Sequence, residues 1–417
     1  MIHEGNTKEK EMTLPVERRM KRWQEQRWIL DNIIKTVGIE WDQARIAYTA
    51  GPCGPEATFD FNMVRQRVTK LADMPREYAA AARRRQTIAE QYEKEGRFVA
   101  ARESYFIASL LWGSAQWAIF ENSPQNLEYN QLKVACYQKF IAHAPRKIER
   151  VEIPFGGKSL PGYLHLPPGW SGEKLPAVLA IDGMDGFKEM MSSMYGDKIL
   201  ERGMAVLAID GPGQGECCTR DIHVTATNFK DAGRACLDWM RKRPEIDGKK
   251  IVTCGVSFGS YWATQVGMVD KDLLGCAVAF VCHEPGNHTI FNMASPTFKL
   301  RFMYMAGYED EEKFDRFSEE FRLDGGEVKC PWLCLAGEDD ELSPIEYTEQ
   351  LFKAIRTPKR LYVYQGEKHG LGGPASALGP SWLTTIAEWL RDRVDGKPMP
   401  SEKIYVDTMG RQHVTPV

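Results

Sequence analysis

The chain has 417 residues, of which 43% are apolar and 27% are charged, and its formal net charge is −3. These values are ordinary for a globular chain and give no basic surface for nucleic acid. No apolar run reaches the roughly 18 residues of a membrane span, and the first residues lack the apolar centre of a signal peptide. We therefore expect a cytoplasmic protein with neither a nucleic-acid nor a membrane partner.

Residues 1–145 are predicted to be helical. In the stretch 15–38, apolar residues recur with a period near 3.6, and Gly38 closes the pattern. Three further helical segments follow at 73–96, 97–120 and 126–144. Strand signals are almost absent from this half of the chain.

From about residue 146 the period changes. An alternating pattern around Gly156 and Gly157 predicts a hairpin. Apolar runs typical of buried strands follow at 176–182, 204–210, 251–257, 274–282, 331–337 and 359–365. Helical segments such as 228–244 separate them, and this alternation predicts an α/β fold, a parallel sheet covered on both faces. We expect this domain to span 146–395 and residues 396–417 to be an extended tail.

Ten cysteines could form disulfides or bind a metal. Most lie inside apolar runs, as Cys254 and Cys334 do, and Cys217 and Cys218 are adjacent and poorly placed for an ordinary bridge. No pair has C-x-x-C spacing, and no histidine stands at zinc-site spacing. We expect buried free thiols, no metal and no organic cofactor.

The stretch 249–265 places Ser257 between two glycines, directly after an apolar run and before a helix-permissive segment. In a parallel sheet, the loops at the carboxyl ends of the strands form the site. A serine in G-x-S-x-G can stand on a strained strand-to-helix bend, where the flanking glycines tolerate the turn and the hydroxyl is exposed. The alternative is a structural turn with an incidental serine, but the surrounding strand and helix favour a nucleophile.

A serine nucleophile needs a base, and the base needs an acid that orients it. In this type of site the chain order is Ser, then Asp or Glu, then His. Two histidines come late enough, and because His413 lies in the polar C-terminal stretch we predict His369, which follows the last strand. Of the four carboxylates at 338–341 we predict Asp340 as its partner, with Asp339 as the second candidate.

The oxyanion that forms on attack needs backbone N–H donors. Phe258 follows the nucleophile and supplies the first. The second comes from the loop after the early strand, where we predict the N–H of Met184, with Gly183 allowing close approach.

Three motifs together resemble the α/β-hydrolase fold over 146–395: the Ser257 bend, GEDDELSP at 337–344 and GEKHG at 366–370. The turn DGPGQGE at 210–216 is similar to the group that contains 2,6-dihydroxypseudooxynicotine hydrolase, the YWA1 chain-shortening hydrolase and the FrsA-like esterases. The segment 90–120 resembles the helical part that precedes the hydrolase domain in that group.

The resemblance implies that residues 1–145 form a cap over the active site and take part in dimer contacts, so we expect a homodimer acting on a small molecule. Two departures from related patterns argue against a lipase and against a peptidase of the prolyl-oligopeptidase type. Asp182-Gly183-Met184 stands where many lipases have His-Gly-Gly, and Ser260 stands where prolyl-oligopeptidase relatives usually have Gly. A serine nucleophile also argues against haloalkane dehalogenases, which need a carboxylate.

The leading hypothesis is a serine hydrolase that cleaves a C–C bond beside a carbonyl in an aromatic ketone or polyketide-like substrate. The carbon leaving group needs a proton, and an auxiliary acid would help. Glu284, then His283 and Glu189, are the candidates, and solvated polar side chains are the alternative for each. Residues 285–326, rich in Phe, Met and Tyr, are expected to form a small lid or to serve ordinary packing.

Two rival functions remain. A carboxylesterase or lactonase would use the same constellation, so the sequence does not separate it from a C–C hydrolase. A helical interaction scaffold is more distant, because stable tetratricopeptide-like arrays need at least about three repeats and at most one and a half can be found here.

Overall fold

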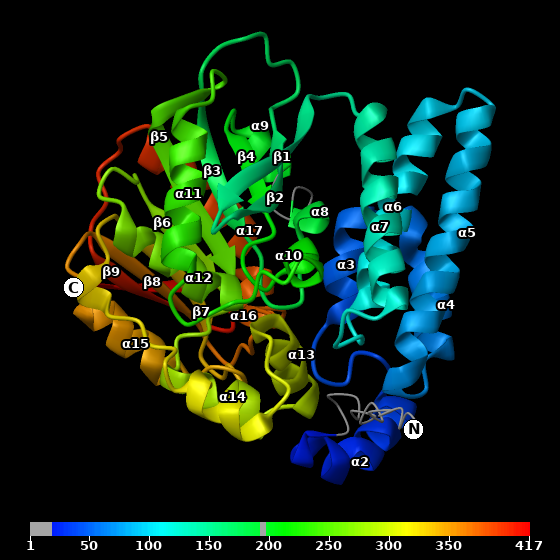
Figure 1. Ribbon diagram of the computed structural model, residues 1–417. Helices are drawn as coiled ribbons and strands as arrows, with labels where there is room; N and C mark the ends of the chain where they lie inside the picture. Colours follow the sequence, from blue (N-terminus) through cyan, green and yellow to red (C-terminus); the bar gives the residue numbers. More distant parts are fainter. Residues whose placement is uncertain (1–18, 192–196) are drawn as a thin grey trace, which may run out of the picture.

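The change of period near residue 146 marks the place where the chain passes from helices to a sheet. The structure, a computed structural model, describes residues 19–191 and 197–417. In Figure 1 the helices of the first part stand beside the sheet and its covering helices. Among these described residues, no helix is both long and apolar enough to cross a membrane.

The helical region, residues 19–145, is built around one central helix. Its helices are α2 (Lys21–Val37), α3 (Arg45–Cys53), α4 (Thr58–Arg67), α5 (Met74–Lys94), α6 (Phe98–Gln116) and α7 (Pro124–Ala142), with 3-10 turns η1 (Pro55–Ala57) and η2 (Leu71–Asp73). Gly96 has a φ of +73°, which lets the chain reverse between α5 and α6. Ser123 caps α7 by accepting the N–H of Asn126, with Pro124 at the first position. Because α5 and α7 both pack on α6, that helix is buried along most of its length.

The strands form one ten-stranded sheet in the order β1-β2-β4-β3-β5-β6-β7-β8-β9-β10. They are β1 (Ile148–Phe155), β2 (Lys158–His165), β3 (Leu175–Ile181), β4 (Ala205–Ile209), β5 (Ile246–Val256), β6 (Cys276–Ala279), β7 (Trp332–Gly337), β8 (Lys359–Tyr364), β9 (Glu402–Val406) and β10 (Gln412–Pro416). β3 to β9 run parallel, whereas β1, β2 and β10 pair antiparallel with their neighbours. The carboxyl ends of β5, β7 and β8 therefore lie along one edge.

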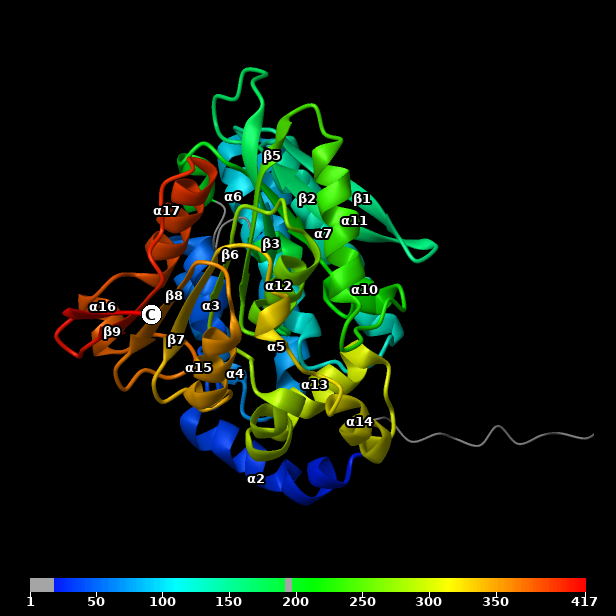
Figure 2. The same cartoon turned by 90° about the vertical axis from the view of Figure 1, so that its left-hand side faces the viewer.

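Helices cover both faces of the sheet. They are α8 (Lys188–Met191), α9 (Asp197–Glu201), α10 (Gly215–Thr219), α11 (Phe229–Arg241), α12 (Phe258–Val269), α13 (Pro296–Ala306), α14 (Glu311–Ser318), α15 (Ile345–Ala354), α16 (Pro374–Leu378) and α17 (Trp382–Val394), with short turns η4 (Pro285–Asn287), η5 (Thr289–Met293) and η6 (Gly325–Glu327). Figure 2 shows α17 and α11 on opposite sides of the sheet.

Alternate strand residues build two separate cores, because successive side chains of a strand point to opposite faces. In β3, Leu179 and Ile181 belong to the core that contains α11 and α12, and Val178 and Ala180 belong to the core that contains α9 and α17. Burying each large aliphatic side chain stabilises the fold by about 1.5–3 kcal/mol. The expected free thiols are found: all ten cysteines are unpaired and, except for half-buried Cys53, buried.

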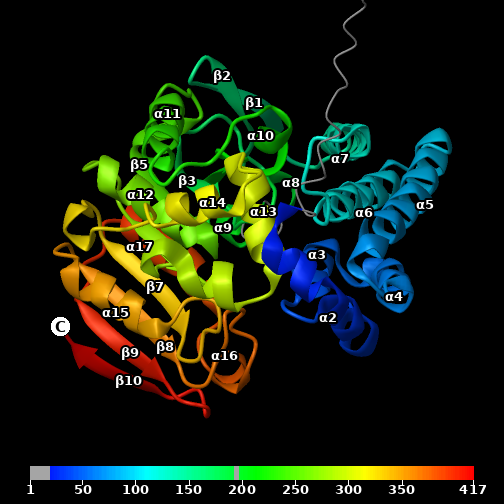
Figure 3. The ribbon, with the colours of Figure 1, turned by 60° about the horizontal axis from the view of Figure 1, so that its bottom comes forward.

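The C-terminal stretch is not a free tail. Residues 402–406 add β9 in parallel to β8, and residues 412–416 return as β10, antiparallel to β9. Figure 3 shows both strands at the sheet edge away from the helical region. The alternation of Ile404 and Val406 with polar residues lets β9 bury one side only, which is why the stretch reads as polar in sequence.

Candidate active site

Ser257 stands on the bend between β5 and α12. Its φ is +54° and its ψ is −128°, a conformation that residues other than glycine rarely adopt. A Cβ on Gly255 would lie 2.0 Å from the Gly259 carbonyl oxygen, and one on Gly259 would lie 2.5 Å from the Ile181 carbonyl oxygen. Both flanking positions thus require glycine. The left-handed backbone of Ser257 itself costs about 1–3 kcal/mol.

His369 bridges Ser257 and Asp340. Its Nε2 lies 3.0 Å from the Ser257 Oγ, and its Nδ1 lies 2.9 Å from the Asp340 Oδ2. Nδ1–H donates to the carboxylate, which leaves Nε2 free to accept the serine hydrogen. Asp340 Oδ1 also accepts the N–H groups of Leu342 and Ser343, so the carboxylate is held in place.

The pKa of His369 is set by two opposing effects. Burial acts to lower its pKa, but the adjacent Asp340 carboxylate outweighs burial, and the pKa of His369 is raised above its ordinary value. Asp339, the second candidate for the acid, is exposed, and His413 lies exposed on β10 paired with Asp407. The structure thus brings together the three residues that the sequence singled out.

The two N–H groups predicted as oxyanion donors belong to Phe258, which directly follows Ser257, and to Met184, which directly follows Gly183. Phe258 is the first residue of α12, so its N–H is one of the donors that a helix N-terminus leaves unpaired. Gly183 packs directly on the serine, since a Cβ there would lie 2.8 Å from the Ser257 Cβ. In the part of the chain that the structure describes, neither the Phe258 nor the Met184 N–H donates to a protein acceptor.

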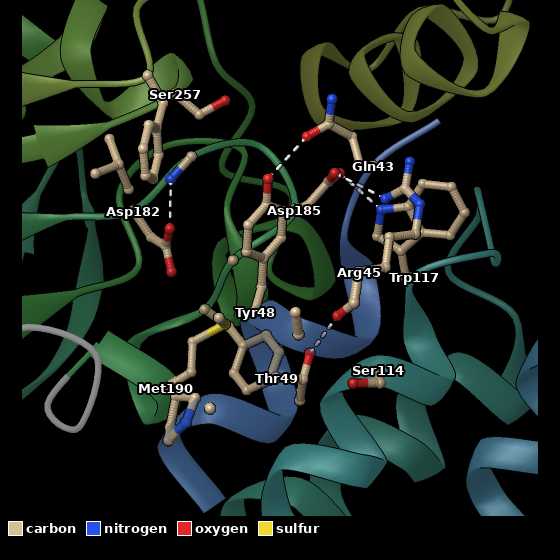
Figure 4. Close-up of a pocket in the computed structure, with 18 of the residues that line it drawn as sticks. Gln43, Arg45, Tyr48, Thr49, Ser114, Trp117, Asp182, Asp185, Met190 and Ser257 are labelled. Carbon is tan, nitrogen blue, oxygen red and sulfur yellow. Dashed lines mark hydrogen bonds and ion pairs between the residues drawn. The ribbon is translucent and has the colours of Figure 1, made fainter. Parts of the chain in front are cut away.

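A cavity of about 380 Å³ opens at Ser257 and His369. One wall comes from the catalytic side, mainly the 182–186 loop, Phe187 and Met190. The opposite wall comes from the helical region, mainly residues 43–52 on and before α3, with Tyr78 and Trp117. Figure 4 shows Ser257 and Asp182 across the cavity from the residues of α3. Most of the lining is apolar or aromatic, which suits an aromatic ligand.

Arg45 joins the helical region to the 182–186 loop. Its guanidinium is buried, donates to Asp42 and Asp185 at 2.9 Å each, and lies 3.5 Å from the centre of the Trp117 ring (Figure 4). Burial acts to lower the pKa of Arg45, but the two carboxylates raise it overall. Trp117 Nε1 also donates to Asp185, at 2.6 Å. Because Asp42 and Asp185 already balance its charge and accept three of its N–H groups, Arg45 serves as a clamp between the helical region and the 182–186 loop.

Three hydroxyls in the cavity wall donate their hydrogens to acceptors within the protein. Tyr48 donates to Gln43 Oε1, Thr49 to the Arg45 carbonyl and Ser114 to the Leu110 carbonyl. Each then offers only oxygen lone pairs to a ligand. The wall therefore matches ligands that donate hydrogen bonds.

Asp182 is a buried carboxyl beside the nucleophile that the sequence did not point to. Its Oδ1 accepts the Gly183 N–H at 2.7 Å, and its Oδ2 has no hydrogen-bond partner among the described residues. Burial raises the pKa of Asp182 to about 7.

The prediction of an auxiliary acid needs correction for Glu284 and His283. Neither lines the cavity. Glu284 accepts the Thr289 N–H at 2.7 Å and so holds the start of η5. His283 hydrogen-bonds Thr348 of α15, and burial lowers the pKa of His283 to about 3, which disfavours the imidazolium form that a general acid needs.

Glu189 does not line the cavity either. It is fully buried behind the 182–186 loop, where Lys188 Nζ donates to its Oε1 at 2.8 Å and Lys133 Nζ lies 3.6 Å from its Oε2. A buried carboxylate held by two ammonium groups is a structural ion pair. Residues 285–326, the expected lid, also lie outside the cavity lining; α13 packs on α2 instead.

The residues that the sequence did not single out are those of α3 and its flank, such as Arg45 and Tyr48. They carry no motif, and only the docking of the helical region brings them to Ser257. The contact of Arg45 with the Trp41 and Trp117 rings exists only in the folded protein, because Trp117 is distant from Arg45 in the chain. In the described part of the chain, no cluster of three or more His, Cys, Asp or Glu side chains is arranged to hold a metal ion.

Comparison with known proteins places this chain in a family. A family model described as "Esterase FrsA-like" matches residues 20–310. The chain is 26% identical to "Alpha/beta hydrolase xenA" of Xenoacremonium sinensis over 60% of each chain. It is 25% identical to "2,6-dihydropseudooxynicotine hydrolase" of Paenarthrobacter nicotinovorans, over 73% of this chain and 82% of that protein.

Solved structures show the same fold. The structure of a 2,6-dihydroxy-pseudo-oxynicotine hydrolase matches with a TM-score of 0.71 at 22% identity, over 84% of this chain and 96% of that one. This likeness confirms the α/β-hydrolase fold. The family model and the relatives named as hydrolases confirm the hydrolase class, so a scaffold as the main function is not retained. The chain belongs to the family of FrsA-like esterases.

Proposed function

We propose that the protein is a serine hydrolase with Ser257, His369 and Asp340 as its catalytic triad. The observation that carries the proposal is the hydrogen-bonded bridge of His369 between Ser257 Oγ and Asp340. His369 Nε2 takes the serine proton as Oγ attacks a carbonyl carbon, and Asp340 stabilises the imidazolium that forms. The N–H groups of Phe258 and Met184 hold the oxygen of the tetrahedral intermediate.

The bond we propose is a C–C bond beside a carbonyl in an aromatic ketone or polyketide-like substrate. Collapse of the intermediate breaks that bond, the carbon fragment takes the proton from His369, and an acyl-Ser257 ester remains. Water, deprotonated by His369, then hydrolyses the ester and restores the serine. A carbanion leaves only when the fragment delocalises its charge, so the substrate must carry an electron-rich ring or a second carbonyl.

The cavity supports an aromatic substrate with hydroxyl groups. Its wall is largely apolar, and the hydroxyls of Tyr48, Thr49 and Ser114 offer lone pairs to ligand donors. The similarity to 2,6-dihydropseudooxynicotine hydrolase, and the shared fold with a solved 2,6-dihydroxy-pseudo-oxynicotine hydrolase, favour this chemistry over simple esters. Ester hydrolysis is the second candidate, because the matching family is described as esterase-like.

The test compares matched substrates. Acylphenols, 1,3-diketones and aryl esters with the same acyl group are offered to the enzyme, and products are identified by mass spectrometry. Turnover of the ketones supports C–C cleavage, and turnover of esters alone excludes it.

The nucleophile is tested on its own. Ser257→Ala should lower kcat by about 10⁵–10⁶-fold, as loss of a triad nucleophile does, and should abolish labelling by a fluorophosphonate probe. Ser260→Ala, in the first turn of α12, is the matched control and should keep both the wild-type kcat and the labelling. Labelling that persists in Ser257→Ala would contradict the assignment.

The homodimer and the role of residues 1–145 as a cap are also proposals. The exposed apolar side chains of Trp28 and Val37 on α2 are compatible with a subunit contact. Light scattering of the full chain measures its mass, and a monomer at micromolar concentration would exclude the dimer.

A further inference from the structure

The turn after β4 reaches the site from behind the 182–186 loop. Its Gln214 is only 1% exposed. The side-chain Nε2 donates to the carbonyl oxygens of Asp182, at 2.7 Å, and Gly183, at 3.0 Å. The Oε1 accepts the N–H of Gly211, at 3.0 Å. Both amide hydrogens and the amide oxygen are engaged, so the orientation of this side chain is fixed.

The contact with Gly183 also fixes the direction of the next N–H group. A trans peptide is planar, and its C=O and N–H point in opposite directions. When Gln214 holds the Gly183 carbonyl, the N–H of Met184 must lie in the same plane and point in the opposite direction, away from Gln214. The preceding N–H, that of Gly183, is taken by the Asp182 carboxylate at 2.7 Å. The Met184 N–H is left without a protein acceptor among the described residues.

Space around the loop leaves little room for another arrangement. Gly183 packs on the Ser257 Cβ, with 2.8 Å to the place of a Cβ. On the far side, a Cβ on Gly211 would lie 2.4 Å from the Phe229 ring and 3.2 Å from the Gln214 Oε1. The amide of Gln214 is therefore clamped between the loop and its own turn.

We propose that Gln214 is a positioning residue, which holds the Gly183–Met184 peptide so that the Met184 N–H faces the oxygen of the tetrahedral intermediate. The inference rests on the proposed function. Gln214 is not among the residues that line the cavity. It acts through the backbone, and this gives the DGPGQGE turn of 210–216 a function beyond connecting a strand to a helix.

The experiment replaces Gln214 by methionine, which has similar length and no donor. Loss or misdirection of one oxyanion donor lowers kcat by about 10²-fold, so we expect that fall in kcat with KM within about twofold. Inhibition by an aryl boronic acid, whose tetrahedral adduct on Ser257 places an oxygen in the same position, should weaken by the same factor. A crystal structure of Gln214→Met should show the Gly183–Met184 peptide rotated.

Gln265→Met is the matched control. Gln265 is also 1% exposed, and its Nε2 donates to the Ala226 carbonyl at 2.5 Å, away from the 182–186 loop. It should lose thermal stability as Gln214→Met does and keep its kcat and its boronic acid affinity. If Gln214→Met does not fold, Gln214→Glu, which keeps the shape and presents oxygens to both carbonyls, takes its place with the same expected losses.

The outcomes separate this inference from the proposed function. A wild-type enzyme that cleaves neither ketones nor esters contradicts the proposed function, and the peptide orientation in the variant crystal then decides the inference alone. An active wild type with unchanged kcat and boronic acid affinity in Gln214→Met overturns the inference. An unrotated peptide, or an equal loss of kcat in Gln265→Met, overturns it as well.

Discussion

The cavity has two walls of different origin. On the catalytic side, Ser257, Asp340 and His369 each follow the end of a strand, and a parallel sheet brings such ends together by its topology. On the other side, α3 contributes Arg45 and Tyr48 without any motif. The positions of Ser257, Asp340 and His369 are therefore set by the sheet, whereas the shape of the cavity depends on how the helical region is docked.

The largest expected effect lies on the catalytic side. Asp340→Asn keeps the shape of the side chain but removes the carboxylate that orients His369, and kcat should fall by about 10⁴-fold. The neighbouring Asp339→Asn is the control, because Asp339 is exposed, and it should stay close to the wild type. Steady-state kinetics on one substrate measure both. Similar losses in the two variants would mean that the acid is wrongly assigned.

A smaller effect is expected where the two walls are joined. Arg45→Met leaves Asp42 and Asp185 without their cation, which should lower the free energy of unfolding by about 3–5 kcal/mol. Without the contact to Arg45 the 182–186 loop can shift relative to Ser257. We expect kcat to fall by up to about 10²-fold, because a displacement near 1 Å at an active site costs that much. Chemical denaturation and kinetics below the transition measure the two effects.

Arg85→Met separates clamping from general destabilisation. Arg85 pairs with Asp60 and Glu56 inside the helical region and does not line the cavity. Its loss should lower stability comparably and leave kcat of the folded enzyme unchanged. If kcat falls equally in Arg45→Met and Arg85→Met, the contact between Arg45 and Asp185 has no special role in the activity.

Substrate selection by the helical region should appear as a modest effect on KM. Tyr48→Phe removes an oxygen that accepts from ligand donors, and a lost hydrogen bond of about 0.5–1.5 kcal/mol raises KM by about 2- to 10-fold. The increase should occur for a hydroxylated substrate and not for its deoxy analogue. Equal KM changes for both substrates would argue against hydrogen bonding at this hydroxyl.

The smallest effect concerns pH. His369 must be neutral to act as a base, so kcat/KM should rise with pH, with a midpoint above the ordinary histidine pKa of about 6.5, because Asp340 and Glu341 raise the pKa of His369. Glu341→Gln should shift the midpoint down by less than about one unit. For stability the sign is opposite: a raised His369 pKa favours folding below about pH 6.5, and this contribution is lost as pH rises through the folded pKa.

Two controls sharpen the pH profile. Glu338→Gln replaces a carboxylate that belongs to the same turn as Glu341 but accepts from the Gly366 N–H and the Tyr405 hydroxyl. It should leave the midpoint of the kcat/KM profile in place. Asp182, whose pKa is about 7, titrates in the same range. If Asp182→Asn moves the midpoint and Glu341→Gln does not, the rise of kcat/KM with pH reports the titration of Asp182 rather than that of His369.

Much of the site could be predicted because its residues follow strand ends in a fixed order. The choice of Asp340 over Asp339 came from its place in the turn, and the hydrogen bonds to His369 agree with that choice. The auxiliary acids were wrong because position along the chain does not reveal burial. Glu284 follows a strand end as a catalytic residue would, yet its carboxylate is used by the Thr289 N–H.

The sequence by itself determined the strands up to residue 365, the strained bend at Ser257 and the chain order of Ser257, Asp340 and His369, because these depend on periodicity and on glycines that no other residue can replace. The tertiary structure decided which residues face the substrate. The docking of α3, the Arg45–Asp185 contact and the hold of Gln214 on the 182–186 loop join segments that are distant in the chain. Such contacts depend on packing between surfaces, and packing leaves no short pattern in a sequence.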